Sequence, residues 1–142
     1  MLSTVAVGTD GSTTASEAVE AAAEIARRFD ARLVLLSASQ ASPGPSAGSS
    51  ATSEELQWAS NKHARVREIL RRTEQDLRDR RIDCTTMVDE GEPAEVLVRL
   101  AEECDADLLV IGNRGMRRRV LGSVPNTVTH KARCSVYIVK TT

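Results

Sequence analysis

The sequence predicts an α/β fold, a doubly wound sheet of five parallel strands with helices on both faces. Two observations lead to this prediction. Strand and helix patterns alternate along the chain, and residues 108–111 (Leu-Leu-Val-Ile) are apolar throughout, as in a strand buried on both faces. Because 142 residues is the usual size of one domain, we expect residues 1–142 to form a single domain.

Five short runs of β-branched and aliphatic residues are predicted strands. The first ends at Asp10, Gly11 and Ser12, residue types that favour turns. The third run alternates polar and apolar residues, which is typical of an edge strand. The predicted strands cover residues 4–9, 32–38, 83–88, 107–111 and 135–140.

Helix patterns fill the intervals between these strands. Thr14 and Glu17 have the spacing of a capping box at the start of the first helix, and Pro93 suits the first turn of the third. In the second helix, apolar residues step by three and four, and His63 on this stripe is predicted to pack in the core. The stretch 41–51, rich in Pro, Gly and Ser, is predicted to be a flexible loop. The predicted helices cover residues 15–29, about 53–80, about 93–104 and 124–132.

Composition excludes several classes of function. A net charge of −1 and only three aromatic residues argue against a general nucleic-acid binder. Three scattered cysteines without a Cys-x-x-Cys pair indicate neither a zinc site nor a redox pair. Because no secretion signal or membrane-spanning pattern is found either, we expect a cytoplasmic protein with reduced thiols.

The clearest functional signal follows the fourth predicted strand. Gly112 and Gly115 are followed by a basic stretch and then by Gly122 and Ser123, just before a helix. Glycines allow backbone N–H groups to approach an anion, and a helix N-terminus offers unpaired N–H donors. We therefore predict that nucleotide phosphates bind between Gly112 and Val124; an arginine-bearing loop exposed to solvent is the alternative interpretation. The arginines in question are Arg114, Arg117, Arg118 and Arg119.

Asp10 is the second candidate, because it follows the first predicted strand. Ligands of doubly wound sheets bind at the carboxyl ends of strands, where the strand order reverses. If the first and fourth strands flank that point, Gly8 and Gly11 lie beside Gly112 and Gly115. Asp10 would then accept hydrogen bonds from a ribose or adenine, or help to hold a metal; alternatively, it only turns the chain.

These residues resemble those of a single-domain universal stress protein over nearly the full length of the chain. The fold implied is Rossmann-like, of the adenine nucleotide alpha hydrolase type, and the Asp10 and Gly-Ser elements suggest the ATP-binding branch. The matching segments are Val7-Gly-Thr-Asp10-Gly-Ser12, Gly91-Glu-Pro-Ala94, Gly112-Asn-Arg-Gly115, Leu121-Gly-Ser-Val124 and the closing strand Ser135–Lys140.

The resemblance implies an adenine nucleotide ligand, namely ATP, AMP or cyclic AMP, with or without magnesium. By position, the adenosine would contact Thr9, Asp10 and Ala38. Ile111 and Gly112 would support the base and ribose. The phosphates would be held by Gly115, Gly122, Ser123 and Val124. A homodimer through the last strand Ser135–Lys140 is also implied, as is a role as a cytoplasmic stress-response regulator with an unknown protein partner.

One departure from the family pattern bears on function. Residues 116–121, between Gly115 and Gly122, form a shorter and more arginine-rich stretch than in the ATP-binding members. Whether this stretch admits a triphosphate stays open. We expect ligand binding to order it, and we predict no catalytic residue, since no obvious base for activating water is present. The alternatives are a slow Mg-dependent ATPase and a scaffolding dimer that binds no nucleotide.

Overall fold

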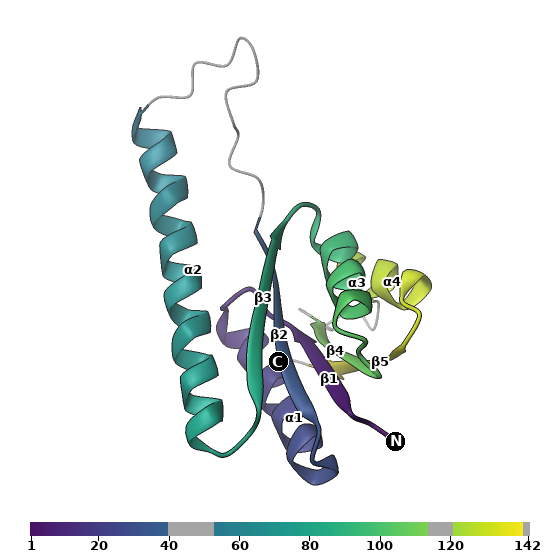
Figure 1. Cartoon of the computed structure of the whole chain (residues 1–142). Coiled ribbons are helices and arrows are strands. Elements are labelled where there is room, and N and C mark those ends of the chain that lie inside the picture. Colours follow the sequence, from purple (N-terminus) through teal and green to yellow (C-terminus); the bar gives the residue numbers. More distant parts are fainter. Residues whose placement is uncertain (40–52, 114–120, 141–142) are drawn as a thin grey trace.

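The computed structural model describes residues 1–39, 53–113 and 121–140, without the side chains of 55–60 (Figure 1). The predicted loop 41–51 therefore lies outside the described residues, as do Gly115 and the arginines of its basic stretch.

Within the described residues, five parallel strands form one sheet in the order β3-β2-β1-β4-β5, which confirms the predicted fold class. The first and fourth strands are neighbours, so the strand order reverses between them as expected. The third strand lies at one edge, as its alternating pattern predicted, and the fifth lies at the other. The strands are β1 (Thr4–Gly8), β2 (Arg32–Ser39), β3 (Cys84–Glu90), β4 (Leu108–Asn113) and β5 (Ser135–Lys140).

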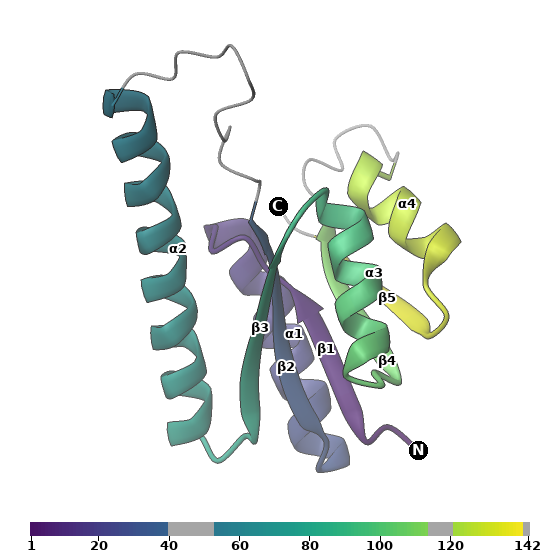
Figure 2. The same cartoon turned by 45° about the horizontal axis from the view of Figure 1, so that its top comes forward.

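Four helices of the described chain cover the two faces of this sheet (Figures 1 and 2). Along β1, Val5 and Val7 face the helices α1 and α2, whereas Ala6 faces α3 and α4. This alternation follows from the two-residue period of a strand, and it divides the aliphatic core into two layers. The helices are α1 (Thr13–Phe29), α2 (Ser53–Asp79), α3 (Pro93–Glu103) and α4 (Ser123–Lys131).

The first helix begins two residues earlier than predicted. The N-cap is Ser12, whose side-chain oxygen accepts a hydrogen bond from the Ala15 N–H at 3.1 Å. The capping role predicted for Thr14 is therefore wrong, because Thr14 already lies in the first helical turn. This shift matters for function, since it brings the start of α1 to the turn that carries Asp10.

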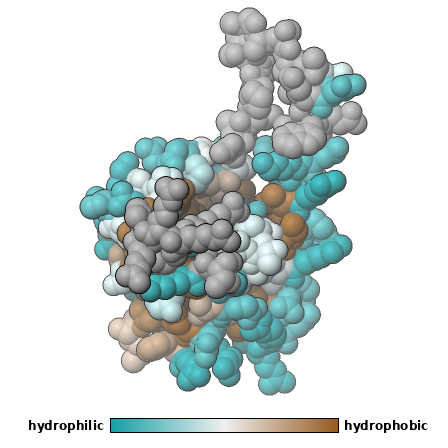
Figure 3. Space-filling model, turned by 180° about the vertical axis from the view of Figure 1, so that it is seen from behind, coloured by the Kyte–Doolittle hydropathy of each residue, from teal (hydrophilic) through white to brown (hydrophobic). Residues whose placement is uncertain are grey.

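Among the described side chains of the long helix α2, the buried ones lie in its C-terminal part. Leu70 and Leu77 of its apolar stripe are buried, but His63 is only half-buried, so its predicted place in the core is wrong. Figure 2 shows the reason, because α2 leans away from β3 toward its N-terminal end. The outward surface of α2 is hydrophilic (Figure 3) and includes ion pairs of Glu68 with Arg71 and Arg72. No helix within the described residues is long and apolar enough to cross a membrane.

Candidate functional site

A cleft of about 350 Å³ lies at the carboxyl ends of β1 and β4, where the strand order reverses. The ends of β1, β2 and β4 contribute to it, together with the N-terminal parts of α1, α3 and α4. The cleft gathers residues that are about a hundred positions apart in the sequence. Eight of the sequence-predicted site residues line it, whereas Gly115 lies outside the described residues. These eight are Thr9, Asp10, Ala38, Ile111, Gly112, Gly122, Ser123 and Val124.

The inner wall of the cleft depends on a glycine at the end of β1. A Cβ atom on Gly8 would lie 3.0 Å from Leu97 Cδ1, which is a tighter contact than nearly all Cβ atoms make, so that Leu97 would have to shift. The absence of a side chain thus allows Leu97 of α3 to pack directly against the strand. Ile111 of β4 is the next neighbour, at 3.5 Å from the same point. The resulting wall is apolar and suits the flat face of a base.

The turn after β1 is held by its own side chains. The Gly11 N–H donates to Thr9 Oγ1 at 3.1 Å, and the Ser12 N–H donates to Asp10 Oδ1 at 2.9 Å. Gly11 adopts a φ of 81°, in the left-handed region that favours glycine. Asp10 therefore does help to turn the chain, which is the alternative role that the sequence analysis gave it. It also lines the cleft, so its carboxylate is placed where a ligand could use it.

The three helices that begin at the cleft differ in how their N-termini are capped. In α1 the acceptor is Ser12, and in α3 the Glu92 carboxylate accepts from the N–H groups of Ala94 and Glu95. In α4 the N-cap is Gly122, which has no side chain to offer. The positive end of α4 is thus the one that a bound anion could complement.

The backbone N–H groups of α4 can be counted one by one. Four such groups at a helix start have no partner within the helix. In α4, the Gly122 N–H donates to Asn113 Oδ1 at 2.9 Å, and Pro125 has no N–H. The two that remain belong to Ser123 and Val124, for which the described residues supply no acceptor. Two N–H donors thus remain at the cleft.

Sequence reasoning missed Asn113, which also lines the cleft and is fully buried. A polar residue after an apolar run suggests a turn, and the sequence alone gives no sign that this one is enclosed. The signal that could have identified it is its position as the last residue of β4, one place after Gly112.

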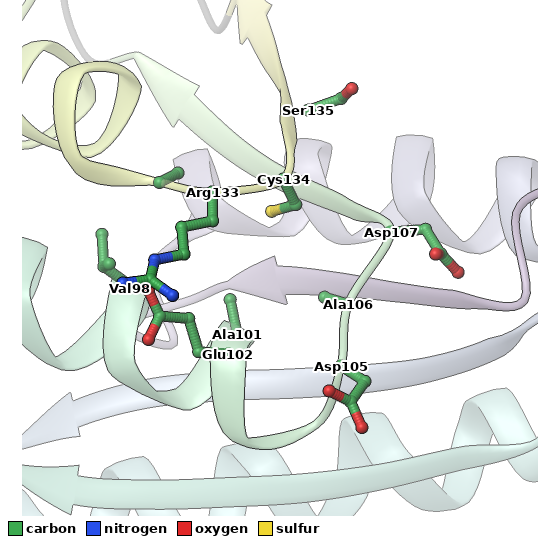
Figure 4. Close-up of a pocket in the computed structure, with 10 residues that line it drawn as sticks. Val98, Ala101, Glu102, Asp105, Ala106, Asp107, Arg133, Cys134 and Ser135 are labelled. Carbon is green, nitrogen blue, oxygen red and sulfur yellow. Dashed lines mark ion pairs between the residues drawn. The ribbon is translucent and has the colours of Figure 1, made fainter.

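A second, larger hollow of about 650 Å³ lies at the opposite end of β4 and β5 (Figure 4). Here Arg133 and Glu102 point toward one another and form an ion pair at 3.5 Å. Asp105 and Asp107 point away from that pair. Cys134 also lines this hollow, and burial raises the pKa of its thiol. The described residues contain no group of three or more side chains that could hold a metal ion. Despite its size, the charged groups of this hollow either pair with one another or point away from that pair, and we favour the smaller cleft as the functional site.

Known proteins resemble this chain over nearly its whole length. Residues 1–140 match the universal stress protein family. Universal stress protein Rv1636 of Mycobacterium tuberculosis is 37% identical over 145 residues, which cover 98% of this chain and 97% of that protein. The match therefore extends over nearly the whole of both chains.

Solved structures show the same likeness. A universal stress protein crystallised in complex with cAMP is 34% identical, with a TM-score of 0.74 and 99% of each chain covered. A universal stress protein family member from Arabidopsis thaliana, with AMP bound, has a TM-score of 0.70 at 21% identity, covering 99% of this chain and 92% of that one. At that identity, the second likeness concerns the fold alone. The sheet order and helices are those of the adenine nucleotide alpha hydrolase-like fold. The chain belongs to the universal stress protein family.

Proposed function

We propose that this protein binds an adenine nucleotide in the cleft between β1 and β4 and acts as a nucleotide-responsive regulator of a stress response. The observation that carries the proposal is the start of α4, where Ser123 and Val124 line the cleft and their N–H groups have no acceptor among the described residues. The family member in complex with cAMP, 34% identical to this chain, supports the same ligand class.

The cleft has the dimensions and lining that an adenosine requires. Its volume of about 350 Å³ lies within the usual range of small-molecule pockets. Apolar contact with the base would come from Ala38 and Ile111, and the backbone at Thr9 and Gly112 borders the same space. The Asp10 carboxylate would accept a hydrogen bond from a ribose hydroxyl or from the adenine amino group.

The phosphates would lie at the N-terminus of α4. There the N–H groups of Ser123 and Val124 donate to phosphate oxygens, and the helix dipole favours their negative charge. Gly122 leaves room for this approach, since it has no side chain. Gly115 is proposed as a further phosphate contact, although it lies outside the described residues.

The nucleotide itself is proposed at the level of its class. ATP, AMP and cAMP share the adenosine and at least one phosphate, and magnesium would accompany a triphosphate. The chain would belong to the ATP-binding branch if the shorter stretch 116–121 admits all three phosphates. We propose no catalytic residue, so that any ATP hydrolysis would be slow.

The assembly proposed is a cytoplasmic homodimer of single domains, joined through β5. This strand is a sheet edge whose Tyr137 is exposed, and an open edge tends to pair with another strand. Pairing two copies of the same strand gives a two-fold interface. Sedimentation equilibrium tests it: a dimer that dissociates in the Tyr137→Asp variant supports pairing through β5, and a monomeric wild-type protein refutes it.

A nuclear magnetic resonance titration locates the ligand. When AMP is added to nucleotide-free protein, we expect saturable shifts of the amide signals of Gly8, Gly112, Ser123 and Val124. Adenosine should shift Gly8 and Gly112 but leave Ser123 and Val124 largely unchanged. Shifts confined to the second hollow, or no saturable shift at all, would refute the proposed site.

A further inference from the structure

We infer that Asn113 is a positioning residue for the nucleotide phosphate, because its side-chain oxygen fixes the start of α4 against the end of β4. The inference rests on the proposed function and assigns a role to a residue of the same cleft. Asn113 would not contact the ligand through this oxygen. It would act through Gly122, by setting the direction in which the next two N–H groups point.

The first step concerns how firmly Asn113 itself is held. It is the last residue of β4, aligned with Lys140 of β5, and its side chain is 0% exposed. A buried side chain at the end of a paired strand has few alternative rotamers. Its oxygen atom is therefore a fixed point of the sheet rather than a mobile surface group.

The second step concerns what this fixed oxygen holds. Asn113 Oδ1 accepts the Gly122 N–H at 2.9 Å, across nine residues of sequence. Gly122 is the N-cap of α4, and its own C=O accepts the first hydrogen bond of the helix, from the Asn126 N–H at 3.0 Å. One side chain thus joins the strand end of the cleft to the first turn of the helix.

The third step concerns the donors left for a ligand. Because Asn113 engages the Gly122 N–H and Pro125 has none, only Ser123 and Val124 offer N–H groups at this helix start. An anion there would be bound by two donors whose positions depend on the Asn113 contact. The contact also requires clearance, since a Cβ on Gly122 would lie 3.3 Å from Asn113 Oδ1.

The test compares AMP with adenosine, which lacks the phosphate. In Asn113→Ala, loss of one hydrogen bond should weaken AMP binding roughly three- to tenfold and leave adenosine binding within about twofold. The matched control is Asn126→Ala, which removes the same amide from an exposed position of α4 and should change neither affinity. Titration calorimetry measures the six dissociation constants, those of the wild-type protein and the two variants for each of the two compounds.

Amide hydrogen exchange supplies a readout that does not depend on ligand. We expect slow exchange at Gly122 in the wild-type protein and faster exchange in Asn113→Ala. Asn113→Asp, which keeps an oxygen acceptor at that place, should restore slow exchange. If Asn113→Ala fails to fold, Gly122→Ala disturbs the same contact from its other side and should show the same selective loss of AMP binding.

The outcomes separate this inference from the proposed function. If the wild-type protein binds AMP and the ratio of AMP to adenosine affinity is unchanged in Asn113→Ala, the inference is overturned while the proposed function stands. Slow Gly122 exchange that persists in Asn113→Ala also overturns it. If the wild-type protein binds neither compound, the proposed function fails and the inference fails with it.

Discussion

Replacing Gly122 with aspartate should separate the stability of the protein from its ability to bind a phosphate. The backbone at Gly122 has a φ of −63° and a ψ of 169°, which any residue adopts, so the change introduces no backbone strain. Aspartate is a favourable N-cap, and relative to glycine it stabilises a helix by a few tenths of a kcal/mol. The cost is the close approach of the new Cβ to Asn113 Oδ1, at 3.3 Å.

The effect on phosphate binding is much larger. A carboxylate about 4 Å from a phosphate, at an effective dielectric constant of about 20, repels it by about 4 kcal/mol. Since each 1.4 kcal/mol corresponds to a factor of about ten, the repulsion lowers affinity by up to about 1,000-fold before screening by salt. We therefore expect Gly122→Asp to weaken AMP binding by at least about 100-fold.

The matched control is Gly122→Asn, which has the same size, the same capping ability and the same close approach to Asn113. It differs from the aspartate variant only in charge. Titration calorimetry with AMP and adenosine measures binding, and thermal unfolding should show both variants within a few degrees of the wild-type Tm. Equal AMP affinities of the two variants would show that the phosphate does not lie at the start of α4.

Three further predictions concern the fold around the site. Ser12→Ala removes the N-cap oxygen of α1 and should lower the free energy of unfolding by about 1 kcal/mol, seen as a shift in the urea midpoint; an unchanged midpoint would contradict the capping role. Burial raises the pKa of the Cys84 thiol to about 12, so Cys84 should resist alkylation at pH 8 until the protein unfolds, as mass spectrometry would show. The Asp107 carboxylate accepts the N–H groups of Thr4 and Ser3, which lowers its pKa; this stabilisation is present above about pH 4 and is lost as pH falls through the folded pKa. Asp107→Asn should therefore reduce the loss of stability on acidification, measured by urea unfolding between pH 3 and pH 6, and an unaltered pH profile would contradict this.

The fold could be predicted because its signals are local and mutually consistent. The apolar run that begins β4 predicts a strand covered on both faces, and the two-residue alternation of β3 predicts an edge strand. The adjacency of β1 and β4 needed one further rule, the reversal of strand order at the ligand site. The helix start was wrong because Ser12 and Thr14 are chemically equivalent caps, and only the path of the turn decides between them.

Part of the candidate site could also be predicted, because some of its sequence signals are local. Glycines and an aspartate at strand ends are visible in the sequence, so that Asp10, Gly112 and Gly122 could be identified from their types and positions. Asn113 could not, because its burial depends on β4, β5 and α4 meeting around it. His63 shows the converse, since a helical stripe predicts which face turns inward but not how far along the helix the sheet extends.

The central claim is that an adenine nucleotide binds this chain, and calorimetric titration of nucleotide-free protein tests it most directly. AMP, cAMP and ATP would each be titrated with and without magnesium. The account predicts saturable binding of at least one of them, at one site per chain. No binding of any of the three would contradict the account and favour a dimer that works as a scaffold.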